Sequence, residues 1–340
     1  LFKRGLIQDD ALPYVGHLER IDIGLSQKTL KQSINTFSLR IVAADIDTFT
    51  WPKLPKEATK YERGRLLIVA GSEKYRGAGL LSIKGALASG AGSIQAALPG
   101  QVSETLWQCS PEVILTDSLE NSSNNSSVIS KFFLKQNLER IDSLLIGPGL
   151  GISDDEDEDP WTQVSEKLER FVGLLVLDAD ALNRIASSSE GWKWFKKRKG
   201  PTLITPHKKE FKRLFVGFDC SCSLNVAIEA ARASGVGVLL KGAHSVLASP
   251  EGNSWQLGES APWVSRTGLG DVLAGFMAGV GSIGMASKNQ IDWELFAVSA
   301  LIHADTALRC KRGSNASLVS ESLSEKIRDI NFAQCLERDI

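Results

Sequence analysis

Short apolar runs that alternate with helical stretches constrain the fold of this chain more than any other feature. Several runs are continuous and end at Gly or Pro, which is typical of strands buried on both faces of a sheet. Regular alternation of strands and helices predicts a doubly wound parallel sheet. The expected strands are Leu66–Ala70, Ser93–Leu98, Val113–Thr116, Ser143–Ile146, Leu174–Leu177, Thr202–Thr205, Val238–Lys241 and Ser245–Ala248, and the expected helices include Gly79–Ser89, Trp161–Phe171, Ala181–Ile185 and Leu224–Ser234.

Bulk composition excludes several classes of protein. A chain of 340 residues with 43% hydrophobic and 23% charged residues has the composition of an ordinary globular protein. Its net charge of −1 gives no general attraction to nucleic acid or to an anionic membrane. No apolar run is expected to approach the roughly 18–20 residues of a membrane span. The start of the chain has no secretory signal pattern, and because it begins with Leu1 we expect further residues upstream.

The five cysteines predict neither a disulfide framework nor a zinc site. Cys220 and Cys222 are one residue apart, and no second pair stands at zinc-finger spacing. The expected state is a set of reduced thiols in a cytoplasmic protein.

Two segments are expected to lie outside the main domain or on its surface. Lys28–Ser38 is polar and linker-like, and the strand pattern restarts only near Leu66. Residues 1–40 are therefore expected to be a leader, and residues 41–340 the main domain. The acidic run Asp154–Asp159 is expected to be a solvated loop, because adjacent acids repel and do not converge on one ion.

The segment Arg266–Gly275 carries the most chemical information. Gly268 and Gly270 stand just before Asp271, and an apolar stripe typical of a helix follows. Glycines at a helix N-terminus expose backbone N–H groups and predict an anion site, most naturally for phosphate. A carboxylate there suits a base that takes a proton from a hydroxyl attacking the phosphate. The alternative is a plain glycine turn in which Asp271 caps the helix.

Further glycine-rich or polar segments follow the expected strands. They are Gly71–Gly79, Gly147–Gly151, Asp178–Asn183, Thr205–Glu210 and Lys241–Ser245. In a parallel sheet these turns share the edge at which ligands bind. We expect Asp178, Asp180, His207, Glu210, Lys241 and Asp271 to supply polar groups to one pocket there. Each segment alone also fits ordinary loop punctuation, with His207, Asp178 and Asp180 as helix caps.

Taken in order, these segments resemble the ADP/ATP-dependent NAD(P)H-hydrate dehydratase family, a branch of the ribokinase-like superfamily. The similar region runs from about Arg63 to Ala307. It contains Y-x-G-A, S-G-A-G, G-P-G-L-G, D-A-D-A-L-N, T-P-H-x-x-E, K-G-x-x-S and G-x-G-D-V-L-A-G. Two departures stand out. Thr267 and Leu269 replace a glycine and a threonine of the usual loop, and Lys208-Lys209 replaces a Pro-Gly turn.

The resemblance implies a ribokinase-like three-layer α/β/α sandwich with a central, mostly parallel sheet. It implies that ADP or ATP phosphorylates the C6 hydroxyl of the S epimer of hydrated NADH or NADPH, after which phosphate is eliminated. Asp271 would be the catalytic base. The remaining roles are an anion hole at Gly268, Leu269 and Gly270; nucleotide binding at Lys241, Gly242, Ala243, His244, Ser245 and Gly270; and substrate binding at Ala78, Gly149, His207 and Asp271.

The resemblance also implies Mg²⁺, with no metal ligand that can be named, and a homo-oligomer. Ile21–Gly24 is similar to the end of an NAD(P)H-hydrate epimerase domain, so an upstream epimerase domain is expected. That fusion favours ADP as phosphoryl donor, while NADH and NADPH hydrates stay undistinguished. Two other functions remain open at this point: a small-molecule kinase of the same superfamily and a non-catalytic nucleotide-binding module.

Overall fold

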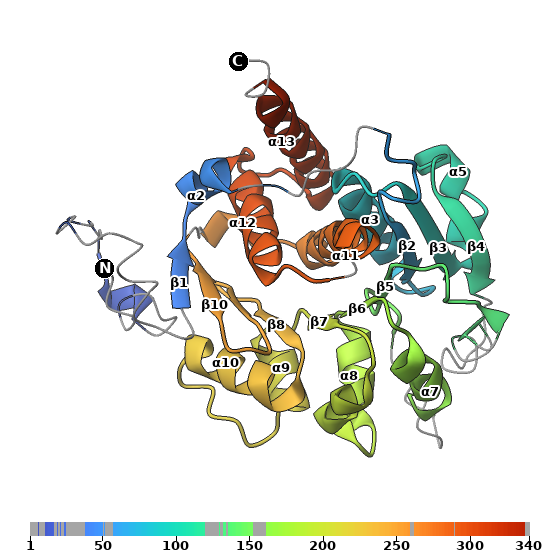
Figure 1. Cartoon of the computed structure of the whole chain (residues 1–340), viewed down its shortest axis with the longest axis horizontal. Helices are drawn as coiled ribbons and strands as arrows, with labels where there is room; N and C mark the ends of the chain where they lie inside the picture. Colours follow the sequence, from blue (N-terminus) through green and yellow to red (C-terminus); the bar gives the residue numbers. More distant parts are fainter. Residues whose placement is uncertain are drawn as a thin grey trace.

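Short strands pair into one ten-stranded sheet in the computed structural model of the chain (Figure 1). The structure describes residues 6, 11–16, 19, 21, 24, 38–49, 51, 57–119, 129, 132–133, 135–151, 161–258, 262–288 and 290–336. The strands are β1 (Ser38–Ile41), β2 (Arg65–Val69), β3 (Ser93–Pro99), β4 (Ile114–Leu119), β5 (Ser143–Ile146), β6 (Leu174–Leu177), β7 (Thr202–Ile204), β8 (Gly237–Leu240), β9 (Val246–Ala248) and β10 (Ser254–Leu257).

Helices follow most of the strands. The longer ones are α3 (Arg76–Ala88), α7 (Thr162–Arg170), α8 (Asp180–Ser187), α9 (Lys208–Leu214), α10 (Ser223–Ser234), α11 (Leu269–Lys288), α12 (Trp293–Arg309) and α13 (Ala316–Leu336). Shorter pieces are α2 (Ala43–Thr48), α4 (Gly100–Ser103), α5 (Leu106–Cys109), η2 (Leu12–Tyr14), η3 (Gly191–Lys197) and η4 (Pro262–Val264).

The sheet is parallel except at one strand. Its order is β1-β10-β9-β8-β7-β6-β5-β2-β3-β4, and β9 alone runs against its neighbours β8 and β10. The parallel strands β2, β5, β6, β7 and β8 therefore end at the same edge. Ligands bind at this edge in doubly wound sheets, so the topology gathers the segments that follow these strands.

Two layers of helices cover the two faces of the sheet (Figure 1). On one face, α2, α3, α11, α12 and α13 enclose one apolar core; on the other, α7, α8, α9, α10 and η3 enclose a second. Strand β2 supplies both cores by alternation, because Leu66 and Ile68 face the first and Leu67 and Val69 face the second. The predicted three-layer sandwich with a mostly parallel sheet is confirmed.

The expected strands all form, with ends shifted by up to a few residues, and two more strands join them. β1 pairs in parallel with β10, which places Ser38 opposite Ser254 at the edge of the sheet. Residues 38–40, assigned to the leader by the sequence, thus lie in the sheet. Ile21 and Gly24 are described individually, whereas Asp22, Ile23 and the acidic run Asp154–Asp159 lie outside the described residues.

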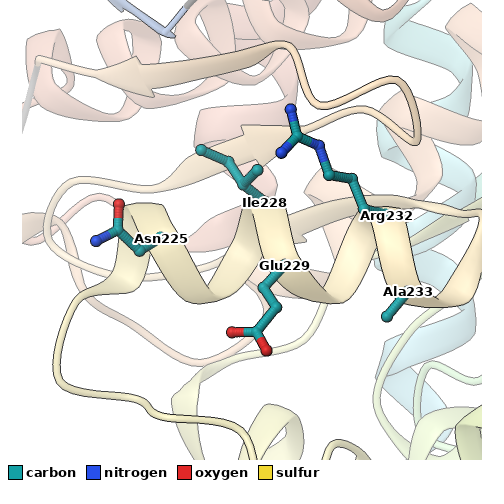
Figure 2. Close-up of a pocket in the computed structure, with 5 residues that line it drawn as sticks. All are labelled: Asn225, Ile228, Glu229, Arg232 and Ala233. Atoms are coloured by element: carbon teal, nitrogen blue, oxygen red, sulfur yellow. The ribbon is translucent and has the colours of Figure 1, made fainter.

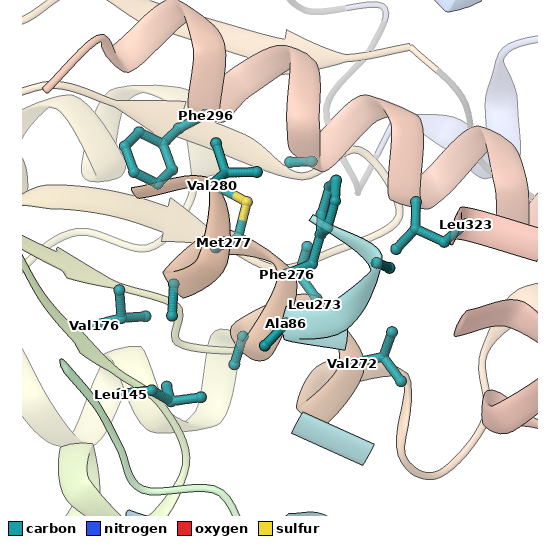
Figure 3. Close-up of a cluster of buried hydrophobic side chains, with 14 of the residues drawn as sticks. Ala86, Leu145, Val176, Val272, Leu273, Phe276, Met277, Val280, Phe296 and Leu323 are labelled. Atoms are coloured by element: carbon teal, nitrogen blue, oxygen red, sulfur yellow. The ribbon is translucent and has the colours of Figure 1, made fainter. Parts of the chain in front are cut away.

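Helices α3 and α11 approach each other closely through glycines. A Cβ built on Gly85 of α3 would lie 2.0 Å from the carbonyl oxygen of Val272. One on Gly275 of α11 would lie 1.9 Å from that of Ser82. Only glycine permits this backbone contact. Figure 3 shows α11 side chains such as Phe276 and Met277 directed into the surrounding core. The packing fixes the first turns of α11 beside the middle of α3, where Gly268 lies against Leu81 and Val272 against Gly85.

The sequence-based expectation that no apolar run approaches a membrane span is wrong for α11. This helix has 20 residues and a mean hydropathy of 1.5 over its most apolar window, and 72% of that window is buried inside the protein. Helix α11 packs against α3, α12 and the strands β2, β5 and β6. Burial in the protein core accounts for its apolar composition. Length and composition alone are weak support for a membrane span.

Candidate active site

The N-terminus of α11 lies at the edge where the parallel strands end. Gly268, just before the helix, has φ +91°, a conformation that favours glycine. A Cβ at this position would also lie 2.5 Å from Leu81 Cδ1 and 3.1 Å from the Cβ of Ala316. The chain can therefore turn into α11 here only with glycine. The first N–H groups of α11, at Leu269, Gly270 and beyond, have no partner within the helix and can bind an anion.

Asp271 is the third residue of α11 and not the residue that precedes the helix, so the simple capping alternative does not describe its position. Burial raises the pKa of its carboxyl to about 7, with a further contribution from the charge of Asp178, an opposing one from Lys241 and a smaller raising one from Asp180. A carboxyl that titrates near neutral pH can accept a proton at the pH of the cell.

Lys241 lies near three carboxylates, those of Asp178, Glu210 and Asp271. Its Nζ donates to Oδ1 of Asp178 over 2.7 Å, and the same oxygen accepts from Thr205 Oγ1 over 2.8 Å. Burial alone lowers the pKa of Lys241, but Asp178, Glu210 and Asp271 outweigh it and the pKa is raised. Lys241 is therefore charged. A Cβ built on Gly270 would lie 3.6 Å from its Nζ, so the ammonium group faces the start of α11.

His207 and Glu210 form a reciprocal cap at the start of α9. Nδ1 of His207 accepts from the backbone N–H groups of Lys209 and Glu210 over 3.1 and 3.2 Å. Oε2 of Glu210 accepts from the His207 N–H over 2.8 Å. The capping alternative for His207 thus describes its ring, although 47% of the side chain stays exposed. Burial raises the pKa of Glu210 despite the nearby Lys241 charge.

The turn Lys241–Ser245 joins the antiparallel strands β8 and β9, as expected. Oγ of Ser245 closes the turn by accepting from the Gly242 N–H and donating to the Gly242 carbonyl, each over 3.2 Å. Gly242 and Ala243 are exposed. His244 points the other way, because its ring is buried and Nδ1 lies 3.0 Å from the carbonyl oxygen of Leu257. Its imidazole therefore links the turn to the end of β10.

Ala78 and Gly149 lie against each other. Gly149 has φ +64°, and a Cβ there would lie 2.5 Å from the Cβ of Ala78 and 2.9 Å from that of Tyr75. The Gly71 N–H donates to the Pro148 carbonyl over 2.8 Å. The segment after β5 is thereby held close to the start of α3, and these two expected substrate-binding residues come from one small region.

The sequence offered little reason to single out His303, a lone histidine in the apolar pattern of α12. Its side chain is 6% exposed, and its Nε2 has no hydrogen-bond partner among the described residues. Burial lowers the pKa of His303 to about 4, although a hydrogen bond to the Leu269 backbone acts in the opposite direction. The imidazole is therefore neutral, and it bonds to the backbone of Leu269, the first residue of α11.

A hollow of about 480 Å³ lies elsewhere, along α10. It is lined by Asn225, Ile228, Glu229, Arg232 and Ala233 (Figure 2). Figure 2 shows Arg232 and Glu229 pointing to opposite sides of this helix. None of the strand-end residues lines this hollow, so it is separate from the candidate active site.

The fold and this edge define a class of protein. A mostly parallel sheet between two helical layers, with a helix N-terminus at the carboxyl edge, is the ribokinase-like α/β architecture. A ribokinase-like superfamily protein from Enterococcus faecalis superposes with a TM-score of 0.68 at 20% identity, covering 86% of this chain and 96% of that one. An ADP/ATP-dependent NAD(P)H-hydrate dehydratase from Bacillus subtilis, co-crystallised with ATP/Mg²⁺, superposes with a TM-score of 0.66 at 23% identity. The match covers 84% of this chain and 96% of that one.

The sequence comparisons narrow the class to one family. The family profile described as NAD(P)H-hydrate dehydratase matches residues 66–329. The chain belongs to this family. It is 35% identical over 285 residues to the bifunctional NAD(P)H-hydrate repair enzyme Nnr of Synechocystis, covering 82% of this chain and 52% of that protein. It is 30% identical over 241 residues to the ADP-dependent (S)-NAD(P)H-hydrate dehydratase of Xanthomonas campestris, covering 70% and 78%. The chain thus spans about half the length of the bifunctional relative.

Proposed function

We propose that this chain dehydrates the S epimer of hydrated NADH or NADPH at the expense of ADP or ATP. Membership of the dehydratase family supports the proposal, as does the name of the Xanthomonas campestris relative. The observation that carries it is the position of Asp271, whose carboxyl has a pKa of about 7 in the first turn of α11. The first N–H groups of a helix suit an anion. That geometry suits a base acting on a hydroxyl next to a phosphate.

In the first step Asp271 takes the proton of the C6 hydroxyl, and the oxygen attacks the terminal phosphorus of the nucleotide. The bond from that phosphorus to the bridging oxygen breaks, and AMP leaves if the donor is ADP. The backbone N–H groups of Leu269 and Gly270 would stabilise the charge on the transferring group, with Lys241 beside them. Phosphoryl transfer of this kind depends mainly on positioning and charge stabilisation.

In the second step phosphate leaves C6 with the bonding electron pair, and water takes a proton from the neighbouring ring carbon. The ring double bond of NADH or NADPH forms. Hydroxide is a poor leaving group and phosphate a good one, which is the reason for the first step. The substrate would lie against Ala78, Gly149 and the exposed face of His207, whereas Gly242, Ala243 and Ser245 would contact the nucleotide.

The charge balance of the site fits an Mg²⁺ ion that arrives with the nucleotide. Among the described residues, no group of three or more His, Cys, Asp or Glu side chains is placed to hold a metal. Lys241 occupies the centre of the nearby carboxylates and pairs with Asp178. Nucleotide phosphates and water commonly supply most Mg²⁺ ligands, and the ion would neutralise phosphoryl charge.

The length of the bifunctional relatives supports an upstream epimerase domain in the complete protein, with the residues before β1 as its end and the linker. ADP is the proposed donor by analogy with the Xanthomonas campestris relative, and we propose a homo-oligomer in the cytoplasm.

The test is a turnover assay with purified protein, hydrated NADH or NADPH, Mg²⁺ and either ADP or ATP. Recovery of the reduced-nicotinamide absorbance, with one phosphate released per NADH formed, supports the proposal. A phosphorylated hydrate that accumulates without recovered absorbance would indicate a kinase. Tight nucleotide binding without turnover of either hydrate would indicate a non-catalytic module. Comparing ADP with ATP at equal concentration identifies the donor.

A further inference from the structure

Both backbone groups of Gly151 are held by the first turns of α8. Its N–H donates to Oδ2 of Asp180 over 2.8 Å, and its carbonyl accepts from Nη2 of Arg184 over 2.8 Å. Asp180 and Arg184 are four residues apart and lie on the same side of the helix. Hydrogen bonds with a charged partner are roughly twice as strong as neutral ones. The end of the Gly147–Gly151 loop is therefore fixed to α8 from two directions.

The other end of this loop, at Gly147, lies against Asp178, two residues before the start of α8. Gly147 has φ +132°, and a Cβ there would lie 1.8 Å from the carbonyl oxygen of Asp178. Ala179, between the two aspartates, has φ +48° and ψ −114°. Among the described residues it is the one non-glycine residue with positive φ. Such strain persists only where the surroundings enforce it, and it is common at functional sites. The turn directs Asp178 to Lys241 and Asp180 to Gly151.

The middle of the loop contains Gly149, which packs against Ala78 and Tyr75. This packing leaves Gly149 little freedom on the side of α3. On the opposite side, the contacts of Gly147 and Gly151 with the Asp178–Asp180 turn determine where Gly149 lies relative to Asp271.

We propose that Asp180 and Arg184 are positioning residues that hold the Gly147–Gly151 loop, and with it the hydrated dinucleotide, in register with Asp271. The proposal rests on the proposed function for the identity of the substrate. It assigns to α8 a role in substrate alignment that is distinct from nucleotide binding at α11 and at the Lys241–Ser245 turn. A misplacement of about 1 Å can cost 10²-fold in rate.

Asp180 has a second effect that Arg184 does not share. Burial is the main cause of the raised pKa of Asp271, and the charges that face it are those of Asp178 at the end of β6, Lys241 at the end of β8 and Asp180 on α8. Asp180→Asn removes one negative charge and so moves the pKa of Asp271 downward. Arg184 is not among the groups that shift this pKa. Both variants are thus expected to release the Gly147–Gly151 loop, whereas only Asp180→Asn is expected to lower the pKa of Asp271.

The experiment compares Asp180→Asn, Arg184→Lys and, as the matched control, Arg213→Gln. Arg213 contacts the same helix through Asn183 over 2.7 Å but, among the hydrogen bonds of the described residues, makes none to Gly151. Both clamp variants should raise KM for the hydrate by about ten-fold, with little change in the Kd for ADP measured by calorimetry. Only Asp180→Asn should shift the midpoint of the pH–rate profile below about 7. The control should change none of these values.

Amide hydrogen exchange at Gly149–Gly151 separates this proposal from the proposed function. Loss of protection in both clamp variants, with wild-type protection in Arg213→Gln, supports the clamp even if the wild type turns over no hydrate. The proposal is overturned if protection is unchanged, or if KM for the hydrate stays at the wild-type value in an active enzyme. It is also overturned if hydrate and ADP binding weaken equally along with a lower Tm, because that pattern indicates general loss of structure.

Discussion

Nζ of Lys241 lies 2.7 Å from Oδ1 of Asp178, and the two residues are 63 positions apart in the chain. The Asp178 side chain is only 2% exposed and that of Lys241 is 20% exposed. The pair joins the end of β6 to the end of β8 across β7. It neutralises a buried carboxylate and leaves the ammonium beside the first turn of α11.

Lys241→Met should destabilise the protein, because it leaves Asp178 charged and buried without a partner. A broken buried pair typically costs about 3–5 kcal/mol, and the partial exposure of Lys241 places the expected loss near the lower figure. Adding Asp178→Asn should restore part of the stability in urea unfolding without restoring ADP binding. Equal unfolding free energies for the single and double variants would contradict the pairing.

The pH dependence of kcat/KM should follow Asp271. The base accepts a proton only as a carboxylate, so activity should rise through about pH 7 and then level off. Lys241 holds this pKa down, so a residually active Lys241→Met enzyme should show a higher midpoint. A profile that is flat between pH 6 and 8, measured with saturating nucleotide, would remove Asp271 from the rate-determining proton transfer.

Asp271→Asn should lower turnover by about 10²–10⁴-fold and retain nucleotide binding. It should also stabilise the folded protein at pH 8. The folded pKa of Asp271 is raised, so its contribution is most favourable below the unfolded value and is lost as pH rises through about 7. Removing the buried charge should gain ~2 kcal/mol at pH 8 in thermal or urea unfolding. The gain should shrink as the pH falls toward the ordinary value of 3.8, and its disappearance below that value serves as the internal control.

Gly268→Ala and Gly270→Ala should separate fold from ligand binding. Gly268 has φ +91° and lies against Leu81, so alanine there should lower the Tm. Gly270 has no such strain, and its new methyl would stand 3.6 Å from Lys241 Nζ, in the space assigned to phosphate. Gly270→Ala should therefore keep or raise stability, by up to about 1 kcal/mol from helix propensity, while weakening ADP binding. Unchanged ADP affinity would place the phosphate elsewhere.

His303 should make the protein sensitive to acid. Its folded pKa is about 4 because of burial, below the ordinary value of 6.5. The unfolded chain binds a proton first as pH falls from about 6.5 to 4, so stability declines across that window, by an amount on the order of 2–3 kcal/mol. His303→Gln should reduce the slope of unfolding free energy against pH there. An unchanged slope would show that other groups govern acid unfolding.

Local patterns in the sequence predicted the strands that build the site. The runs Ser143–Ile146 and Leu174–Leu177 form β5 and β6 with the expected bounds, because strands buried on both faces leave a continuous apolar signature. The polar and glycine segments after them could be assigned to one edge, since parallel strands share their direction. The roles of individual site residues remain predictions.

Other features depend on contacts between distant parts of the chain. β1 and β10 carry weak local signals. β10 joins the sheet beside β9, and β1 forms the edge by pairing with β10. The family resemblance predicted nucleotide binding by His244, whereas its ring is buried and its Nδ1 lies 3.0 Å from the carbonyl oxygen of Leu257. His303 gave no sequence signal because its environment is supplied by α11.

The sequence by itself determined the order of strands and helices, the family and the segments that meet at the carboxyl edge, because hydrophobic periodicity and turn residues act locally. Tertiary structure alone decided which carboxylate is paired, which is poised near pH 7 and which holds a loop. Asp178, Asp180 and Asp271 have the same side chain, and only burial and the charges brought near by packing give them different chemistry.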